Sequence, residues 1–215
     1  MPYQLGLWRV ACSPLCQACL LYPKEIGYLC QPCHDEMNYL PEPLNILLDT
    51  GDTLPIVYAT SYTGVMRQAI AGFKDDGNVA TLPILLQALR ELADIMPTDA
   101  VILPVPTTHA RLRERGFFPV GLLARYLSHF SGLPIYEGVV RHMDSVRQRH
   151  LGRAERLHNL DNAFVMSYEP PTDSVILFDD VATTGSTLKS LVQTLYECDT
   201  VRDVGAVCLV HGDGR

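Results

Sequence analysis

Three short runs of almost unbroken apolar residues constrain the fold of this chain more than any other feature of its sequence. They are AVILPVP at 100–106, SVILFDD at 174–180 and VGAVCLV at 204–210. A strand with one face in water alternates apolar and polar residues, whereas a strand buried on both faces does not. Because stretches of helical periodicity separate the runs, we expect an α/β fold in which helices flank a parallel sheet.

The rest of the chain divides by composition. Residues 1–40 hold clustered cysteines and little apolar periodicity, and three prolines mark the segment 41–55. We therefore expect a small module at 1–40, a linker at 41–55 and the main domain at 56–215. Within that domain, periodicity predicts a strand at 56–62 and helices at 65–73, 82–96, 120–130 and 186–196, with Pro83 in a first helical turn.

Composition and charge limit the classes of protein to consider. With 47% hydrophobic and 19% charged residues, the chain is typical of globular proteins, and no apolar run is long enough to span a bilayer. We see no secretory signal at the start, so we expect a cytoplasmic protein with reduced cysteines. The net charge is −7, yet the segment 103–158 holds nine arginines and four acidic residues. This contrast favours a local anion site, although a solvated charged face is the simpler interpretation.

The segment Asp179–Thr187, DDVATTGST, follows the second apolar run and has the residues of a phosphate site. Two carboxylates end the predicted strand, and a loop of small hydroxyl residues around a glycine opens the next helix, whose free amides attract anions. The carboxylates fit vicinal hydroxyls or a divalent cation such as Mg²⁺. A phosphate and a diol together describe ribose 5-phosphate. The expected ligands are Asp179 and Asp180 for the hydroxyls or Mg²⁺, and Thr183, Thr184, Gly185, Ser186 and Thr187 for the phosphate.

Other phosphate motifs do not match this segment. No lysine follows Gly185, which excludes a Walker A loop, and the chain has no G-x-G-x-x-G for a dinucleotide. The simplest alternative is that the two acids and the small residues only cap a strand and a helix.

Four cysteines predict a structural zinc site near the start of the chain. Cys16 and Cys19 form one C-x-x-C pair, and Cys30 and Cys33 form a second pair after a ten-residue arm. Four thiolates arranged in this way fit a tetrahedral Zn²⁺. The metal would hold together a segment that has too few apolar residues for a hydrophobic core of its own. Cys12 or His34 can replace one ligand, and a haem attachment site, a redox pair and ordinary reduced thiols are weaker alternatives.

Several of these motifs together resemble known proteins. VILFDDVATTGST resembles the phosphoribosyl pyrophosphate (PRPP) signature of type I phosphoribosyltransferases. More specifically, the chain resembles the ComF family, phosphoribosyltransferase-like proteins linked to natural DNA uptake (competence) in bacteria. The resemblance extends over nearly the whole chain. It rests on the paired C-x-x-C motifs, PVP followed by RLRERGF at 111–117, the phosphate loop, and Gln148, Leu151, Arg156, Asn159, Ala163 and Phe164. One departure is Phe118-Pro119, where the family often has Asn-Gln.

The resemblance implies a phosphoribosyltransferase-like sheet and a PRPP pocket that uses Mg²⁺. The pyrophosphate of PRPP then needs a second anion site, for which the loop 107–115 is the natural candidate, because Arg111 and Arg115 share a face if that loop is helical. We expect Thr107, Arg111 and Arg115 there, with Lys74 as a weaker candidate that is otherwise a helix-terminal cation. The basic segment 141–158 is implied to belong to the hood and mobile loop, or it contacts single-stranded DNA.

Three functions remain open from the sequence. The first is a PRPP-binding phosphoribosyltransferase-like protein, with or without catalysis, that serves competence. The second is a non-enzymatic adaptor that binds single-stranded DNA or proteins of the uptake machinery. The third is a salvage phosphoribosyltransferase that acts on a base. The sequence identifies neither a nucleophile nor a catalytic base.

Overall fold

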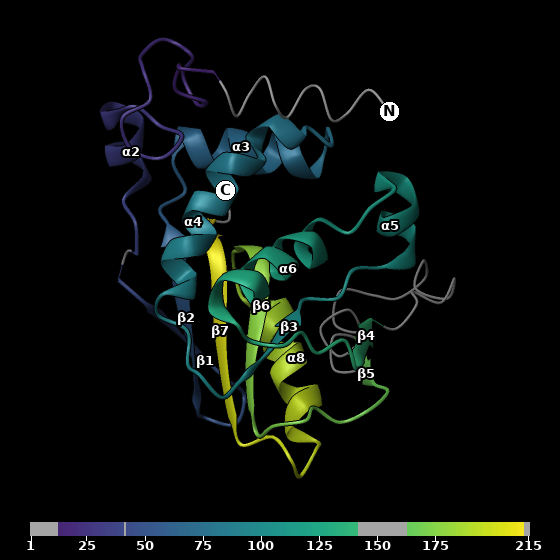
Figure 1. Cartoon of the computed structure of the whole chain (residues 1–215). Coiled ribbons are helices and arrows are strands. Elements are labelled where there is room, and N and C mark those ends of the chain that lie inside the picture. The colour runs from purple at the N-terminus through teal and green to yellow at the C-terminus, as the bar shows by residue number, and fades with distance from the viewer. Residues whose placement is uncertain (1–12, 41, 142–162, 213–215) are drawn as a thin grey trace.

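A five-stranded sheet organises the computed structural model, which describes residues 13–40, 42–141 and 163–212 (Figure 1). The strand order is β1-β2-β7-β6-β3, in which the last four strands are parallel and β1 is antiparallel to β2. The strands are β1 (Leu44–Leu47), β2 (Thr53–Thr60), β3 (Val101–Pro104), β6 (Ser174–Ala182) and β7 (Asp203–His211).

The three apolar runs form the centre and one edge of this sheet, as predicted. They become β3, β6 and β7, and their side chains are buried on both faces over most of their length. Val101 pairs with Val175, which pairs with Val204. The carboxyl ends of β3 and β6 therefore lie together at one edge of the sheet, which is where ligands bind in folds of this class.

Helices cover both faces of the sheet, which confirms the predicted α/β class. The apolar residues of α3 (Gly64–Lys74), α4 (Leu82–Ala93) and α6 (Pro119–Ser131) form one buried cluster, and those of α8 (Ser186–Tyr196) belong to a second cluster on the other face (Figure 1). Pro83 lies in the first turn of α4, as predicted. That helix ends at Ala93 instead of Met96, because the residues that follow fold back in a turn.

Smaller elements complete the described chain. They are α2 (Gln31–Met37), the 3₁₀ turn η1 (Val79–Thr81), α5 (His109–Arg115), β4 (Val139–Arg141) and β5 (Phe164–Met166). The last two strands pair with each other as a separate antiparallel ribbon. None of the described helices has the length and apolar character needed to cross a membrane.

The segment 41–55 contributes to the sheet. It contains β1 and the first residues of β2, which form an antiparallel pair around the turn 48–52. The buried cysteines Cys16, Cys30 and Cys33 belong to the same apolar cluster as α3 and α4. The division of the chain into a module at 1–40, a linker and a domain from 56 stays a prediction.

Several predicted features lie outside the described residues. These are Cys12, the segment 142–158 of the basic region, and Gln148, Leu151, Arg156 and Asn159 of the family motif.

Candidate functional site

The two acidic residues stand at the end of the long central strand β6. Asp180 is buried, at 3% exposure, and the Nζ of Lys74 lies 2.9 Å from its Oδ1 and 2.8 Å from its Oδ2. Lys74 is the last residue of α3, so this ion pair joins α3 to the end of β6. A buried carboxylate without a partner would be costly, and Lys74 supplies that partner.

Asp179 is in a different electrostatic state from its neighbour. Its Oδ1 accepts a hydrogen bond from the backbone N–H of Asp180 at 2.9 Å. Burial and the adjacent Asp180 carboxylate raise the pKa of Asp179 to about 8, above the ordinary value of 3.8. The two carboxyl groups therefore oppose each other's ionisation, and Lys74 favours the charged form of Asp179 from the other side.

The arginine-rich loop forms α5, directly after the strand β3. Thr108 caps the helix, because its Oγ1 accepts a hydrogen bond from the backbone N–H of Arg111 at 3.3 Å. Arg111 and Arg115 are separated by one turn, as predicted for a helical segment. An Nη2 of Arg115 lies 3.1 Å from Oδ1 of Asp75, the residue after Lys74.

These groups meet around one cavity of about 200 Å³ at the carboxyl edge of the sheet. The predicted residues in its wall are Lys74, Thr107, Arg111, Arg115, Asp179, Asp180 and Thr187. They come from four separate segments of the chain and include three cations, two carboxyl groups and two hydroxyls. Such a wall suits a ligand with both negative charge and hydroxyl groups.

The remaining wall residues were not predicted as site residues from the sequence. Arg141 comes from β4, and the apolar part is built from Val105, Pro106, Phe118, Pro119, Val120 and Val181. Phe118 and Pro119 are the positions at which the chain departs from its family pattern. The ring of Phe118 lies over Gly121, where any Cβ would come within 2.3 Å of it. The basic run at 141–158 was the one sequence signal for Arg141, and the departure at Phe118-Pro119 was the one signal for the apolar wall.

The loop 183–187 meets the cavity through one residue only. Thr187 lies in the wall, whereas Thr183, Thr184, Gly185 and Ser186 do not. Thr184 donates to the hydroxyl of Ser186 at 3.3 Å, and α8 begins at Ser186. Gly185 has φ +70°, and a Cβ there would lie 1.9 Å from Cδ1 of Ile46 in β1, so the end of that side chain would have to move. The backbone conformation is the main reason for a glycine at this position.

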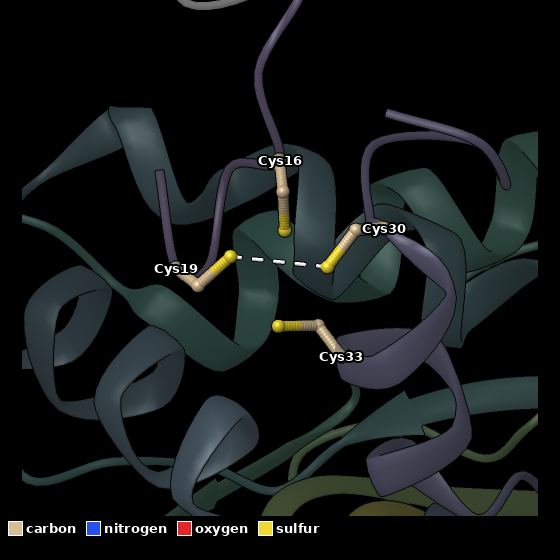
Figure 2. Close-up of side chains that lie close together, drawn as sticks. All are labelled: Cys16, Cys19, Cys30 and Cys33. Carbon is tan, nitrogen blue, oxygen red and sulfur yellow. Dashed lines mark hydrogen bonds between the residues drawn. The ribbon is translucent and has the colours of Figure 1, made fainter. Parts of the chain in front are cut away.

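The four cysteines of the two C-x-x-C pairs come together as predicted (Figure 2). All four Sγ atoms lie within 4.8 Å of one another, and those of Cys19 and Cys30 are 3.8 Å apart. Figure 2 shows the four side chains pointing toward a common centre. Among the described residues, this is the one group of at least three Cys, His, Asp or Glu side chains close enough to hold a metal ion.

The thiols have unequal proton affinities in this arrangement. Burial opposes ionisation of Cys16, but backbone N–H groups of Cys19 and Cys30 outweigh it and lower the pKa of Cys16 to about 6. Burial and the neighbouring thiols raise the pKa of Cys33. A thiolate beside protonated thiols is the state from which a soft cation displaces the remaining protons. His34 is not a member of the group.

Comparison with known proteins gives two close sets of relatives. The chain is 30% identical over 201 residues to competence protein F of Haemophilus influenzae, which covers 88% of this chain and 87% of that protein. It is 28% identical over 212 residues to the DNA utilization protein YhgH of Salmonella typhi, which covers 91% of this chain and 87% of that protein. No family model matches the chain.

Among solved structures, the model is similar to orotate phosphoribosyltransferase from Aeropyrum pernix. The sequence identity is 20%, the match covers 78% of this chain and 73% of that protein, and the TM-score is 0.39.

Proposed function

This chain belongs to the competence protein F (ComF) family, and from that membership we propose that the cavity at the carboxyl edge of its sheet binds PRPP together with Mg²⁺ in the service of DNA uptake. The observation that carries the proposal is the convergence of two loops on one cavity. The acidic end of β6 and the arginine helix α5 lie more than 60 residues apart in the sequence, yet both line the same wall.

The acidic residues fit the ribose end of the ligand. Carboxylate oxygens accept hydrogen bonds from vicinal hydroxyls and are good ligands for Mg²⁺. In the structure Lys74 holds Asp180, so a ligand that brings its own cation would take over this role. Lys74 would then be free to turn toward the phosphates, and the positive charge beside Asp179 would lower its pKa and release a proton.

The basic residues fit the pyrophosphate end. Arg111 and Arg115 lie in the same wall as Thr107, and guanidinium groups match phosphate oxygens with paired hydrogen bonds. Arg141 adds a fourth cation to this wall from the ribbon β4–β5. Four cations against two carboxyl groups leave the cavity net positive, which suits PRPP, a strongly negative ligand.

The 5-phosphate would bind at the start of α8. This helix has eleven residues, and its first backbone N–H groups lack partners within the helix. Thr187, which lines the cavity, belongs to its first turn. The hydroxyls of Thr183, Thr184 and Ser186 lie beside that turn and are exposed, so a small movement of the loop would bring them to a bound phosphate.

We propose that the four-cysteine group holds one Zn²⁺ with a structural role. The donor set Cys₄ and its convergent geometry suit tetrahedral zinc. The group ties the turn at 16–19 to α2, whose own seven residues would form a marginal helix in isolation.

The PRPP proposal is tested by calorimetric titration of the whole protein with PRPP, with and without Mg²⁺. The wild-type protein should bind PRPP with Mg²⁺ and more weakly without it. Asp180→Asn should weaken binding about 100-fold, because it removes the carboxylate proposed to hold Mg²⁺ and the ribose hydroxyls. Asp199→Asn, an exposed carboxylate in the turn after α8, is the matched control and should bind as the wild type does.

Two outcomes decide the proposal. If PRPP gives no heat of binding with wild-type protein and Mg²⁺, the proposal is wrong. If Asp180→Asn and Asp199→Asn weaken binding equally, Asp180 has no specific role in it. A second measurement separates transfer from sensing. If pyrophosphate is released in the presence of a panel of bases and amines, the protein is a transferase, whereas stable binding without release favours a PRPP sensor.

A further inference from the structure

The first residues of α6 are poorly suited to starting a helix. Phe118 occupies the cap position, where Ser, Thr, Asp or Asn normally accepts a hydrogen bond from the free backbone N–H groups, and its side chain makes no such bond. Gly121, three residues later, is also unfavourable within a helix. Because both residues cost helix stability, their role lies outside the helix itself.

These two residues are matched to each other. A Cβ at Gly121 would come within 2.3 Å of the Phe118 ring, so the glycine makes room for the ring to lie over the helix. The ring is only partly buried. It lines the cavity at the carboxyl edge of the sheet, and it also lines a second hollow of about 250 Å³. The aromatic residue at the start of α6 is thus a wall that two hollows share.

The second hollow combines apolar side chains with two opposite charges. Phe117, Phe118 and Leu122 supply apolar surface. Arg125 of α6 supplies a guanidinium, and Glu137, from the segment before β4, supplies a carboxylate. Both charged side chains are exposed, and within the described part of the chain neither forms an ion pair or a side-chain hydrogen bond. The hollow therefore offers a donor and an acceptor that no described residue of the protein uses.

This combination fits a flat ring with acceptors and donors along its edge. Guanine has both, because its O6 and N7 accept from a guanidinium, and its N1–H and 2-amino group donate to the two oxygens of one carboxylate. Adenine lacks the 2-amino group and has an acceptor at N1, which would face the carboxylate unfavourably. The volume of the hollow lies below that of cavities for larger ligands and suits a single ring system.

We propose that this hollow binds a guanine base, which stacks on Phe118 between Arg125 and Glu137. Arg125 would donate to O6 and N7, and Glu137 would accept from N1–H and the 2-amino group. The base comes either from a free nucleoside or from a single DNA strand, since the ring is the same in both. The proposal does not rest on PRPP in the neighbouring cavity.

A ligand-observed NMR titration of the whole protein with 2′-deoxyguanosine tests the proposal. This probe has neither a phosphate nor vicinal hydroxyls, so it does not report on the cavity proposed for PRPP. The wild-type protein should bind it about tenfold more tightly than 2′-deoxyadenosine, because the carboxylate selects the donors of guanine. A short oligothymidylate with one central guanine, compared with plain oligothymidylate, distinguishes the sources. Tighter binding of the guanine-bearing strand makes DNA a source, and equal binding of the two strands leaves the free nucleoside.

Glu137→Gln separates recognition of the base from a general effect on the surface. Because Glu137 is exposed, the variant should fold as the wild type does. Its amide N–H₂ group would face the donors of guanine, so the affinity for deoxyguanosine should fall about tenfold and the preference over deoxyadenosine should disappear. Glu42→Gln, at another exposed glutamate, is the matched control and should keep both the affinity and the preference.

Phe118→Leu tests the aromatic wall. It should weaken the binding of both nucleosides by about tenfold, because it removes the ring on which they stack, and it should keep the preference that Glu137 sets. The proposal is wrong if the wild-type protein does not bind deoxyguanosine or binds the two nucleosides equally. It is also wrong if Glu137→Gln keeps the preference or if Phe118→Leu leaves both affinities unchanged.

Discussion

The cysteine module and the carboxyl-edge cavity place their functional groups in opposite ways. Near the start of the chain, four thiols from 18 consecutive residues already point at one centre and lie within 4.8 Å of one another. At the cavity, the charged groups come from four distant segments and hold one another instead, through Lys74 with Asp180 and Arg115 with Asp75. The proposed zinc would bind to thiols that already lie close together, whereas the proposed ligand of the cavity would have to replace ion pairs within the protein.

This contrast has a consequence for what each site contributes. A metal bound by preformed thiolates adds its binding free energy directly to the folded state. A ligand at the cavity must first replace existing ion pairs, so its net effect on stability is smaller and depends on pH and salt. We therefore expect changes in the module to act mainly on folding, and changes at the cavity to act mainly on binding.

The largest expected effect follows from removing one thiolate of the module. Wild-type protein should contain one zinc per chain, and Cys19→Ser should lose most of it. Because residues 13–40 bury only Leu29 and Met37 besides three of the cysteines, the metal-free variant should unfold about 10 °C lower. Metal analysis and calorimetric melting of the purified chains measure both effects.

Cys198→Ser is the control for this change. Cys198 is 8% exposed and lies in the apolar cluster around α8, away from the four-cysteine group. It should keep its zinc and lose only about 1 kcal/mol of stability. A well-folded wild type without zinc would contradict the metal assignment itself.

The convergence of the four cysteines was predictable from the sequence, because they are close in the chain. Spacing alone placed Cys16, Cys19, Cys30 and Cys33 together, and the structure agrees. The cavity was only partly predictable. Adjacent loops at the carboxyl edge follow from parallel strands, and the acids of β6 and the arginines of α5 meet there. Arg141 and the ring of Phe118 reach the wall through tertiary packing, and no local pattern encodes that.

The segment 41–55 shows a second limit. Its three prolines gave no sign that residues 44–47 form a strand, whose pairing with β2 needs only four residues. Pro55 is accepted within β2, where it pairs with Asn45. Proline ends a helix far more strictly than it ends a strand near an edge.

A smaller effect is expected from Gly185→Ala, which tests whether the cavity site depends on local geometry as the module does. The alanine would adopt φ near +70° against its preference, and its Cβ would displace the end of Ile46. We expect a loss of about 1–2 kcal/mol in the free energy of unfolding. The loss in the free energy of PRPP binding should be larger. Urea titration and calorimetry compare the two. Unchanged affinity would mean that the start of α8 does not hold the ligand.

The pH dependence of stability separates the two sites further. The pKa of Asp179 is about 8 in the folded chain and near 3.8 when unfolded, so the folded state holds the extra proton between these values. Stability is therefore lost as pH rises through this window. Asp179→Asn keeps the acceptor for the N–H of Asp180 and removes the titration. Its advantage over wild type should grow from pH 4 to pH 8, to about 1 kcal/mol after allowance for solvent. If the free energies of unfolding of the two proteins change in parallel with pH, the extra proton of the folded state is not on Asp179.

The smallest expected effect concerns Asp75, which competes with the ligand for Arg115. The side chain of Asp75 is 61% exposed and that of Arg115 is 24% exposed, so their ion pair adds little to stability. Asp75→Asn should leave the free energy of unfolding within about 0.5 kcal/mol of wild type. It should strengthen PRPP binding about threefold at low salt, because Arg115 then turns to the pyrophosphate at no cost, and salt should reduce this gain. Asp76→Asn, the exposed neighbour, serves as control. If Asp75→Asn weakens PRPP binding instead, the carboxylate of Asp75 holds Arg115 in the position that the ligand needs. The cavity would then have its binding geometry before the ligand arrives, as the four cysteines do.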